Sequence, residues 1–241
     1  ASSLEPWADR TRAAGYTVQI GAVEVSGFPT AVDLELTDVT VGQPDGALPW
    51  EWRVDVIRGA SGGAGVSLRI VGEQTLTYTA GGEAHTLRAA AQRFRIEAGE
   101  TDDGGRGVYV DVRGLILDRP AGLGRVTAER FELRAALGDG PGAIPDRTEA
   151  LVSLQNLVLP EHRRGPLGDT ISVLKSELVF IEVLESLDLP VSLADWRDGE
   201  GLIGLRDLSV SWGTLQMEVR SGALTLDDAF RPVSGFYANV S

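Results

Sequence analysis

Hydrophobic and polar residues alternate along much of this chain with a period of two. The alternation is strictest between residues 207 and 220, where two alternating runs flank the pair Gly213-Thr214. Strict alternation is typical of a β-strand with one buried face, and a short link containing glycine predicts a hairpin. The apolar face of this hairpin would carry Leu208, Val210, Trp212, Leu215, Met217 and Val219.

A second alternating run places Val108, Val110 and Val112 on one face of a strand. The alternation then shifts by one residue at Gly114, as it does at Gly222 in the later stretch. A glycine at such a shift predicts a β-bulge, which bends the strand. Both stretches continue into Leu-x-Leu-Asp and then Arg-Pro. This is a weak internal repeat with a spacing of roughly one hundred residues, and it suggests two similar β-halves.

Comparable patterns predict strands over much of the remaining chain. Residues 169–188 are compatible with a helix or a strand, and the even spacing of their β-branched side chains favours a strand. The glycine-rich residues 59–65 predict a flexible turn, and helices are expected only at residues 2–14 and 192–197. The further predicted strand segments are 16–42 (a hairpin), 50–57, 66–71, 74–79, 86–97, 125–137 and 151–159.

The expected fold is therefore all-β and mainly antiparallel. We expect a large, curved and twisted sheet of about a dozen strands that forms a groove or an open barrel. The Gly/Pro-rich loop after residue 137 suggests an N-terminal helix (1–15), a first β-half (16–137) and a second β-half (138–241). The alternative is that the two halves form one continuous domain.

Composition narrows the range of functions. The formal net charge of −13 argues against nucleic acid as a partner, because phosphate contacts need clustered Lys and Arg. It also argues against electrostatic docking of the whole chain on anionic lipid. There is no cysteine, which excludes disulfides, zinc thiolates and thiol nucleophiles. No stretch reaches the roughly 20 apolar residues of a transmembrane helix, and no signal peptide is present.

The sequence carries no catalytic motif, and we do not expect an enzyme. The two histidines, His85 and His162, fall in predicted polar turns, and the Gly-x-Ser-x-Gly elbow of serine hydrolases is missing. The acidic turn at residues 101–105 lacks the spacing of a calcium loop. No metal and no cofactor are therefore expected.

Short motifs follow one another in order: Gly27-Phe28-Pro29, Gly72-Glu73-Gln74-Thr75-Leu76, Trp196-Arg197-Asp198-x-Glu-Gly, Leu208-Ser-Val-Ser-Trp212-Gly213, Gly222-x-Leu-x-Leu-Asp227 and Arg231-Pro232. Together they resemble an uncharacterised alphaproteobacterial envelope family. The resemblance implies a membrane-spanning anchor upstream of Ala1, more chain after Ser241, and a position on the periplasmic side of the inner membrane. It brings no catalytic residues. The closing meander is also similar to the repeats of AsmA-like envelope proteins, which form β-grooves for lipid.

These observations predict a protein that binds a lipid or another hydrophobic ligand, in lipid transport or envelope homeostasis. The apolar side chains of the two alternating stretches would line the groove: Leu208, Val210, Trp212, Leu215, Met217, Val219, Val108, Val110 and Val112. The main alternative is a non-enzymatic scaffold that fills its own core and binds an envelope protein partner. A hydrolase that uses His85 or His162 is a third alternative.

Overall fold

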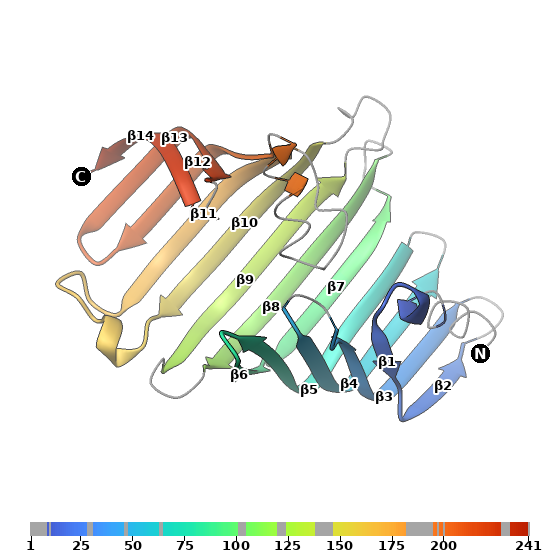
Figure 1. Cartoon of the computed structure of the whole chain (residues 1–241). Helices are drawn as coiled ribbons and strands as arrows, with labels where there is room; N and C mark the ends of the chain where they lie inside the picture. Colours follow the sequence, from blue (N-terminus) through green and yellow to red (C-terminus); the bar gives the residue numbers. More distant parts are fainter. Residues whose placement is uncertain are drawn as a thin grey trace.

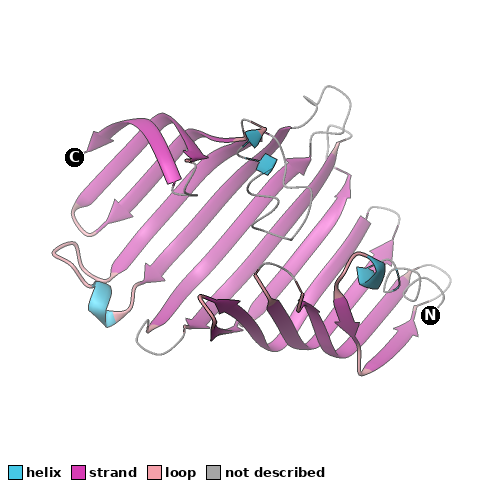
Figure 2. Cartoon of the chain, viewed as in Figure 1, coloured by secondary structure: helices cyan, strands magenta, loops and turns pink. Residues whose placement is uncertain are grey.

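The structure is a computed structural model of the 241-residue chain. It describes residues 9, 11–27, 31–45, 48–62, 65–100, 105–119, 124–137, 147–181, 195–196, 198–199, 201–227 and 232–240. Nearly all of this is β-strand (Figure 2). The strands are β1 (Thr17–Gln19), β2 (Ala22–Ser26), β3 (Val32–Gln43), β4 (Trp50–Gly62), β5 (Gly65–Ala80), β6 (Glu83–Ala90), β7 (Arg93–Glu100), β8 (Arg106–Asp118), β9 (Arg125–Leu137), β10 (Arg147–Val158), β11 (Thr170–Ile181), β12 (Leu202–Trp212), β13 (Leu215–Leu226) and β14 (Pro232–Val240).

All of these strands belong to one antiparallel sheet with the order β1-β3-β4-β5-β6-β8-β9-β10-β11-β12-β13-β14. β2 continues the line of β1 along β3, and β7 continues the line of β6 between β5 and β8. The sheet is thus twelve strand positions wide, and Figure 1 shows it as one broad curved layer. The predicted all-β, mainly antiparallel fold with about a dozen strands is confirmed.

β9 pairs with β10, so the sheet is continuous on either side of residues 138–146, where the sequence suggested a division into halves. The strand predicted from residue 169 is confirmed as β11, and the part of the prediction beyond Ile181 lies outside the described residues. The same holds for most of the two predicted helices, of which residues 9, 11–13, 195 and 196 are described as helix and residue 14 as a turn. No described helix is long and apolar enough to cross a membrane.

Three local predictions were wrong. The segments 66–71 and 74–79 form a single strand, β5, because its ladder with β4 absorbs the interruption at Gly72 as a register shift. The segment 86–97 is instead two strands, β6 and β7, separated at residues 91 and 92. Residues 59–62 belong to β4 and not to a turn, since residues 59–61 pair with both β3 and β5 and Gly62 pairs with Gly65 of β5.

Backbone irregularities on neighbouring strands lie beside one another and form a line that we call the crease. At Asp55 the β4–β5 register shifts, and the Asp55 carboxylate accepts a hydrogen bond from the Glu73 backbone N–H at 3.1 Å. Such irregularities bend strands and increase their twist. The crease runs through Asp38 (φ 52°), Asp55, Gly72 (φ 92°), the break between β6 and β7, Gly114 (φ 59°), Asn156 (φ 47°) and the register shift between Ile171 and Val173.

The buried core lies where the sheet folds over at its N-terminal end. Leu36 on one side of the crease packs in one cluster with Val39 and Val54 on the other side. The sheet is therefore bent toward its apolar face here, and Figure 1 shows β1 and β6 turned over its lower edge. Elsewhere the molecule is open. Its accessible surface is 14773 Å², whereas a compact globular monomer of 25.6 kDa exposes about 10,400 Å².

Candidate binding surfaces on the two faces of the sheet

The strand registers keep the alternation in phase across the sheet, so that residues directly opposite one another form cross-strand rows. Apolar row 1 consists of Val23, Leu36, Ile57, Ile70, Phe94, Val112, Phe131, Leu154, Leu174, Val210 and Met217. Apolar row 2 consists of Val25, Leu34, Gly59, Leu68, Ile96, Val110, Leu133, Val152, Ser176, Leu208 and Val219.

The two rows are two residues apart on every strand, so they share one face, which we call the apolar strip. At about 4.8 Å per strand, eleven positions make the strip roughly 48 Å long, and two rows make it roughly 14 Å wide. The two rows therefore cover about 700 Å² of the sheet. Part of this area is buried, because Leu36 lies in the folded N-terminal core and Val112 and Val219 are only 3% and 2% exposed. The described strands form a single layer, so no second sheet packs on the strip.

The structure places all nine residues predicted to line a groove on this face. Val112, Val210 and Met217 lie in row 1, and Val110, Leu208 and Val219 lie in row 2. Val108 is two residues before Val110 on β8, and Trp212 and Leu215 form the last pair of the β12–β13 ladder. The structure therefore brings the two predicted stretches together on one continuous surface.

The groove residues predicted from the sequence did not include those of β9, β10 and β11, which lie between the two predicted stretches in the sheet. Phe131, Leu154 and Leu174 join Val112 to Val210 in row 1. Their own strands alternate as well, so that signal was present in the sequence. What the sequence lacked was the register that puts these side chains opposite one another.

Polar groups are nearly absent from the strip. Ser176 is the one polar side chain in the two rows, and its buried hydroxyl has no hydrogen-bond partner. Trp212, which flanks row 1, donates its indole N–H to the Gly168 carbonyl at 3.2 Å and thereby leaves only ring carbon available to a ligand. The strip can make apolar contacts and almost no hydrogen bonds.

The residues between the two apolar rows point to the opposite face of the sheet, and this face is polar. One row contains Glu24, Glu35, Arg58, Arg69, Arg95, Asp111, Glu132, Ser153, Lys175, Ser209 and Glu218. Asp111 in this row lies close to three arginine side chains. The Asp111 side chain is only 2% exposed, and its carboxylate oxygens lie 3.1 Å from Arg93 Nε, 3.4 Å from Arg113 Nε and 3.5 Å from Arg130 Nε.

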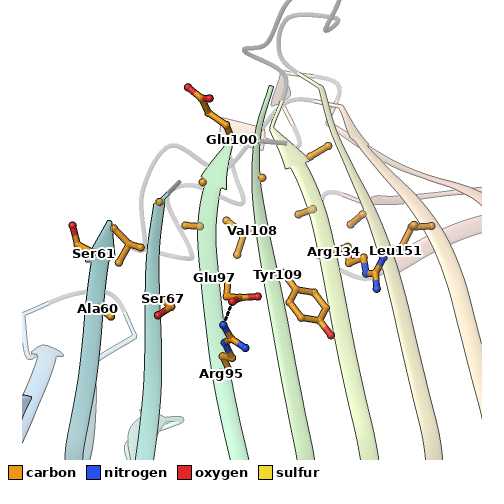
Figure 3. Close-up of a pocket in the computed structure, with 18 of the residues that line it drawn as sticks. Ala60, Ser61, Ser67, Arg95, Glu97, Glu100, Val108, Tyr109, Arg134 and Leu151 are labelled. Carbon is orange, nitrogen blue, oxygen red and sulfur yellow. Dashed lines mark ion pairs between the residues drawn. The ribbon is translucent and has the colours of Figure 1, made fainter. Parts of the chain in front are cut away.

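A hollow of about 1190 Å³ lies against the strand ends of this polar face. Its floor is a row of residues with little or no side chain: Gly62, Gly65, Gly99, Gly107 and Ala136. Figure 3 shows Tyr109, Arg134 and the ion pair between Arg95 and Glu97 beside it. Of the nine predicted groove residues, the lining of this hollow includes Val108, and a smaller hollow of about 260 Å³ includes Val210 and Met217.

Tyr109 is held in place at the rim of the larger hollow. Its hydroxyl donates a hydrogen bond to Glu132 Oε1 at 2.8 Å, and the Arg134 guanidinium lies 5.2 Å from its ring centroid. Burial, followed by the hydrogen bond to the Glu132 carboxylate, raises the pKa of Tyr109 above its ordinary value of 10.0. The phenol is therefore a neutral donor, which does not suit it to act as a base.

The two histidines do not meet a catalytic partner among the described residues. His85 packs beside Tyr78, with 5.2 Å between the ring centroids, and neither His85 nor His162 hydrogen-bonds to a serine or a carboxylate there. His162 lies in a short 3-10 turn, Glu161–Arg163. Within the described part of the chain no group of three or more His, Asp or Glu side chains could hold a metal ion.

A sequence model of the bacterial family DUF2125, described as "uncharacterized protein conserved in bacteria", matches residues 1–237. Neither a curated protein nor a solved structure matches the chain. Because the family match spans nearly the whole sequence, the chain belongs to this family of uncharacterized proteins conserved in bacteria, DUF2125.

Proposed function

We propose that this protein binds the hydrocarbon chains of a lipid, or a similar hydrophobic ligand, on its apolar strip. The observation that carries the proposal is the unbroken alignment of apolar row 1 across eleven strand positions. A sheet that is apolar only for its own stability needs a second layer on that face. The described strands supply none outside the folded N-terminal end.

The chemistry of the strip favours a hydrocarbon over a protein partner. Protein interfaces carry about one hydrogen bond per 100–200 Å², which would amount to several over about 700 Å². The strip offers a single hydroxyl, at Ser176, and its backbone groups are used within the ladders. An acyl chain needs no hydrogen bonds and loses none when it lies there.

The free energy available is sufficient for useful binding. Complete burial of a methylene contributes about 0.8 kcal/mol, and a chain that lies on an open surface buries about half of its own area. A sixteen-carbon chain would therefore gain on the order of 6 kcal/mol before the cost of immobilisation. Two chains side by side fit a strip roughly 14 Å wide.

We place this activity on the periplasmic side of the inner membrane, in lipid transport or envelope homeostasis. The placement is supported by the resemblance of the motif series to envelope proteins and of the closing meander to AsmA-like repeats. The upstream membrane anchor is part of the same proposal.

Neighbouring residues on β10 provide a matched test. Val152 lies in the middle of apolar row 2, and Ser153 points to the opposite face of the same strand. The purified protein would be incubated with phosphatidylcholine vesicles, re-isolated and examined by native mass spectrometry. We expect one or two lipids bound per wild-type chain, at least a fivefold loss for Val152→Asp, and no loss for Ser153→Asp.

If Val152→Asp does not fold, Val152→Thr provides the test instead, because threonine keeps the shape of the valine side chain. Val152→Thr should reduce lipid retention to an intermediate level. Circular dichroism would confirm that all variants remain folded. A wild-type protein that retains no phosphatidylcholine, or folded Val152→Asp protein that retains as much as wild type, would refute the proposal.

A second candidate function, partner binding at a sheet edge, is favoured by the exposure of β14. Phe236 is 60% and Tyr237 is 83% exposed, and in the described part of the chain β14 pairs only with β13. An edge of this kind can accept a strand from another chain. Cross-linking from position 237 to a partner protein in a protein that retains no lipid would favour this function over the first.

A further inference from the structure

Arginine residues gather on the polar face in two cross-strand rows. Arg58, Arg69 and Arg95 lie directly opposite one another on β4, β5 and β7. The second row has an arginine on each of β7, β8 and β9 and lies two residues away on the same face. It consists of Arg93, Arg113 and Arg130.

The local charge is opposite to that of the whole chain. Between the crease and the strand ends, this face of β4, β5, β7, β8 and β9 carries seven arginines, the six above and Arg134, against the carboxylates of Glu97, Asp111 and Glu132. Glu35 and Asp33 of β3 add a fourth and a fifth carboxylate. A formal excess of two positive charges therefore remains in a chain whose net charge is −13. We call these seven side chains the arginine cluster.

Like charges directly opposite one another destabilise a sheet, so the two arginine rows cost folding free energy. Carboxylates on the same face offset only part of this repulsion. Arg58 pairs with Glu35 at 2.7 Å, and Asp111 serves three guanidinium groups at once. Arg69 lies between Arg58 and Arg95 and has no carboxylate partner in the described residues.

The cluster remains accessible although its charges are crowded. The side chains of Arg58, Arg93 and Arg113 are 58%, 43% and 48% exposed, and Arg69 and Arg134 are exposed as well. Asp111 holds Arg93, Arg113 and Arg130 from below, and Arg130 also donates to Glu132 Oε1 at 2.8 Å. The outward-facing N–H groups of this row are therefore those of Arg93 and Arg113, whose side chains are the more exposed. Guanidinium groups in such positions bind phosphate oxygens in pairs of parallel hydrogen bonds.

We infer that the arginine cluster binds the phosphate groups of an anionic ligand, on the face opposite the apolar strip. The three cluster positions of each row span about 10 Å across the sheet, which suits a ligand with two or more phosphates or a lattice of phosphate head groups. The overall charge of the chain does not prevent this, because charges beyond about 10 Å are screened at physiological ionic strength. The inference does not depend on lipid binding by the strip.

Arg69 and Arg53 allow a matched test. Arg69 is the unpaired centre of the first row, whereas Arg53 of β4 lies beyond the crease and pairs with Glu51 at 2.7 Å. Pyrophosphate would be titrated into wild type, Arg69→Gln and Arg53→Gln by isothermal calorimetry at an ionic strength of about 0.1 M, where distant charges are screened. We expect about tenfold weaker binding for Arg69→Gln, and a change of less than about twofold for Arg53→Gln.

The same three proteins would be floated with phosphatidylglycerol vesicles to distinguish a soluble phosphate ligand from a lipid head group. Loss of flotation in Arg69→Gln, without detectable pyrophosphate binding by wild type, assigns the site to head groups. Pyrophosphate binding without flotation assigns it to a soluble ligand. Binding of neither probe by wild type, or equal weakening in both variants, overturns the inference. Retention of phosphatidylcholine reports on the apolar strip alone, so the two proposals fail separately.

Discussion

Removal of the Asp111 charge tests how the polar face holds its arginines together. Asp111→Asn keeps the shape of the side chain and removes the only buried carboxylate among the described residues that reaches Arg93, Arg113 and Arg130. Arg93 and Arg113 would then lose their carboxylate partner, and Arg130 would keep only Glu132, at 2.8 Å. The variant should be less stable than wild type.

The size of the effect follows from burial. Loss of one partner from a buried ion pair costs about 3–5 kcal/mol. The Asp111 side chain is 2% exposed, but its three partners are 33% to 48% exposed, so water and salt replace part of the lost interaction. We therefore expect a loss of about 2–4 kcal/mol. With a urea dependence of about 3 kcal/mol/M for a chain of this size, the unfolding midpoint should fall by about 1 M.

Urea unfolding followed by circular dichroism would measure the midpoint. Asp207→Asn is the matched control, because Asp207 is an exposed carboxylate on the same face of β12. Added sodium chloride should restore part of the stability of Asp111→Asn, because it screens the arginines from one another. Further replacement of Arg113 by Gln should also restore part of it. An Asp111→Asn midpoint equal to that of the Asp207→Asn control would show that the reasoning is wrong.

Two other features give testable predictions. Gly114→Ala should destabilise the protein by about 1–2 kcal/mol, because a left-handed backbone disfavours alanine and the new Cβ would lie 2.7 Å from the Gln92 side chain. Gly235→Ala, where a Cβ meets nothing within 4 Å, should change the urea midpoint far less, and equal shifts would contradict the role of the crease. The bidentate contact with Arg125 at 2.7 and 3.0 Å lowers the pKa of Asp118. Because the folded pKa is lowered, this contribution to stability is present above the ordinary pKa and disappears as the pH falls through the lowered one. A carboxyl NMR titration should show a higher Asp118 pKa in Arg125→Gln, and an unchanged pKa would exclude Arg125 as its cause.

Much of the fold could be predicted because strand structure is encoded locally. The alternation around Val110 and Val210 assigned both strands and the side of each strand that is apolar, since side chains point to opposite faces with a period of two. The shift of alternation at Gly114 likewise marked a real irregularity with a left-handed backbone. At Gly222 the predicted bulge lies slightly earlier, between Val219 and Ser221.

The surfaces could not be predicted in the same way, because they depend on register between strands that are distant in sequence. A shift of one residue in any ladder would have broken the apolar rows, and nothing in a single strand specifies its partner's position. The arginine rows were invisible for the same reason, since Arg58, Arg69 and Arg95 come from three strands. The sequence by itself determined strands with one apolar and one polar face. Only the tertiary structure aligned those faces into a strip and a charge cluster, because cross-strand hydrogen bonds and the crease set the register.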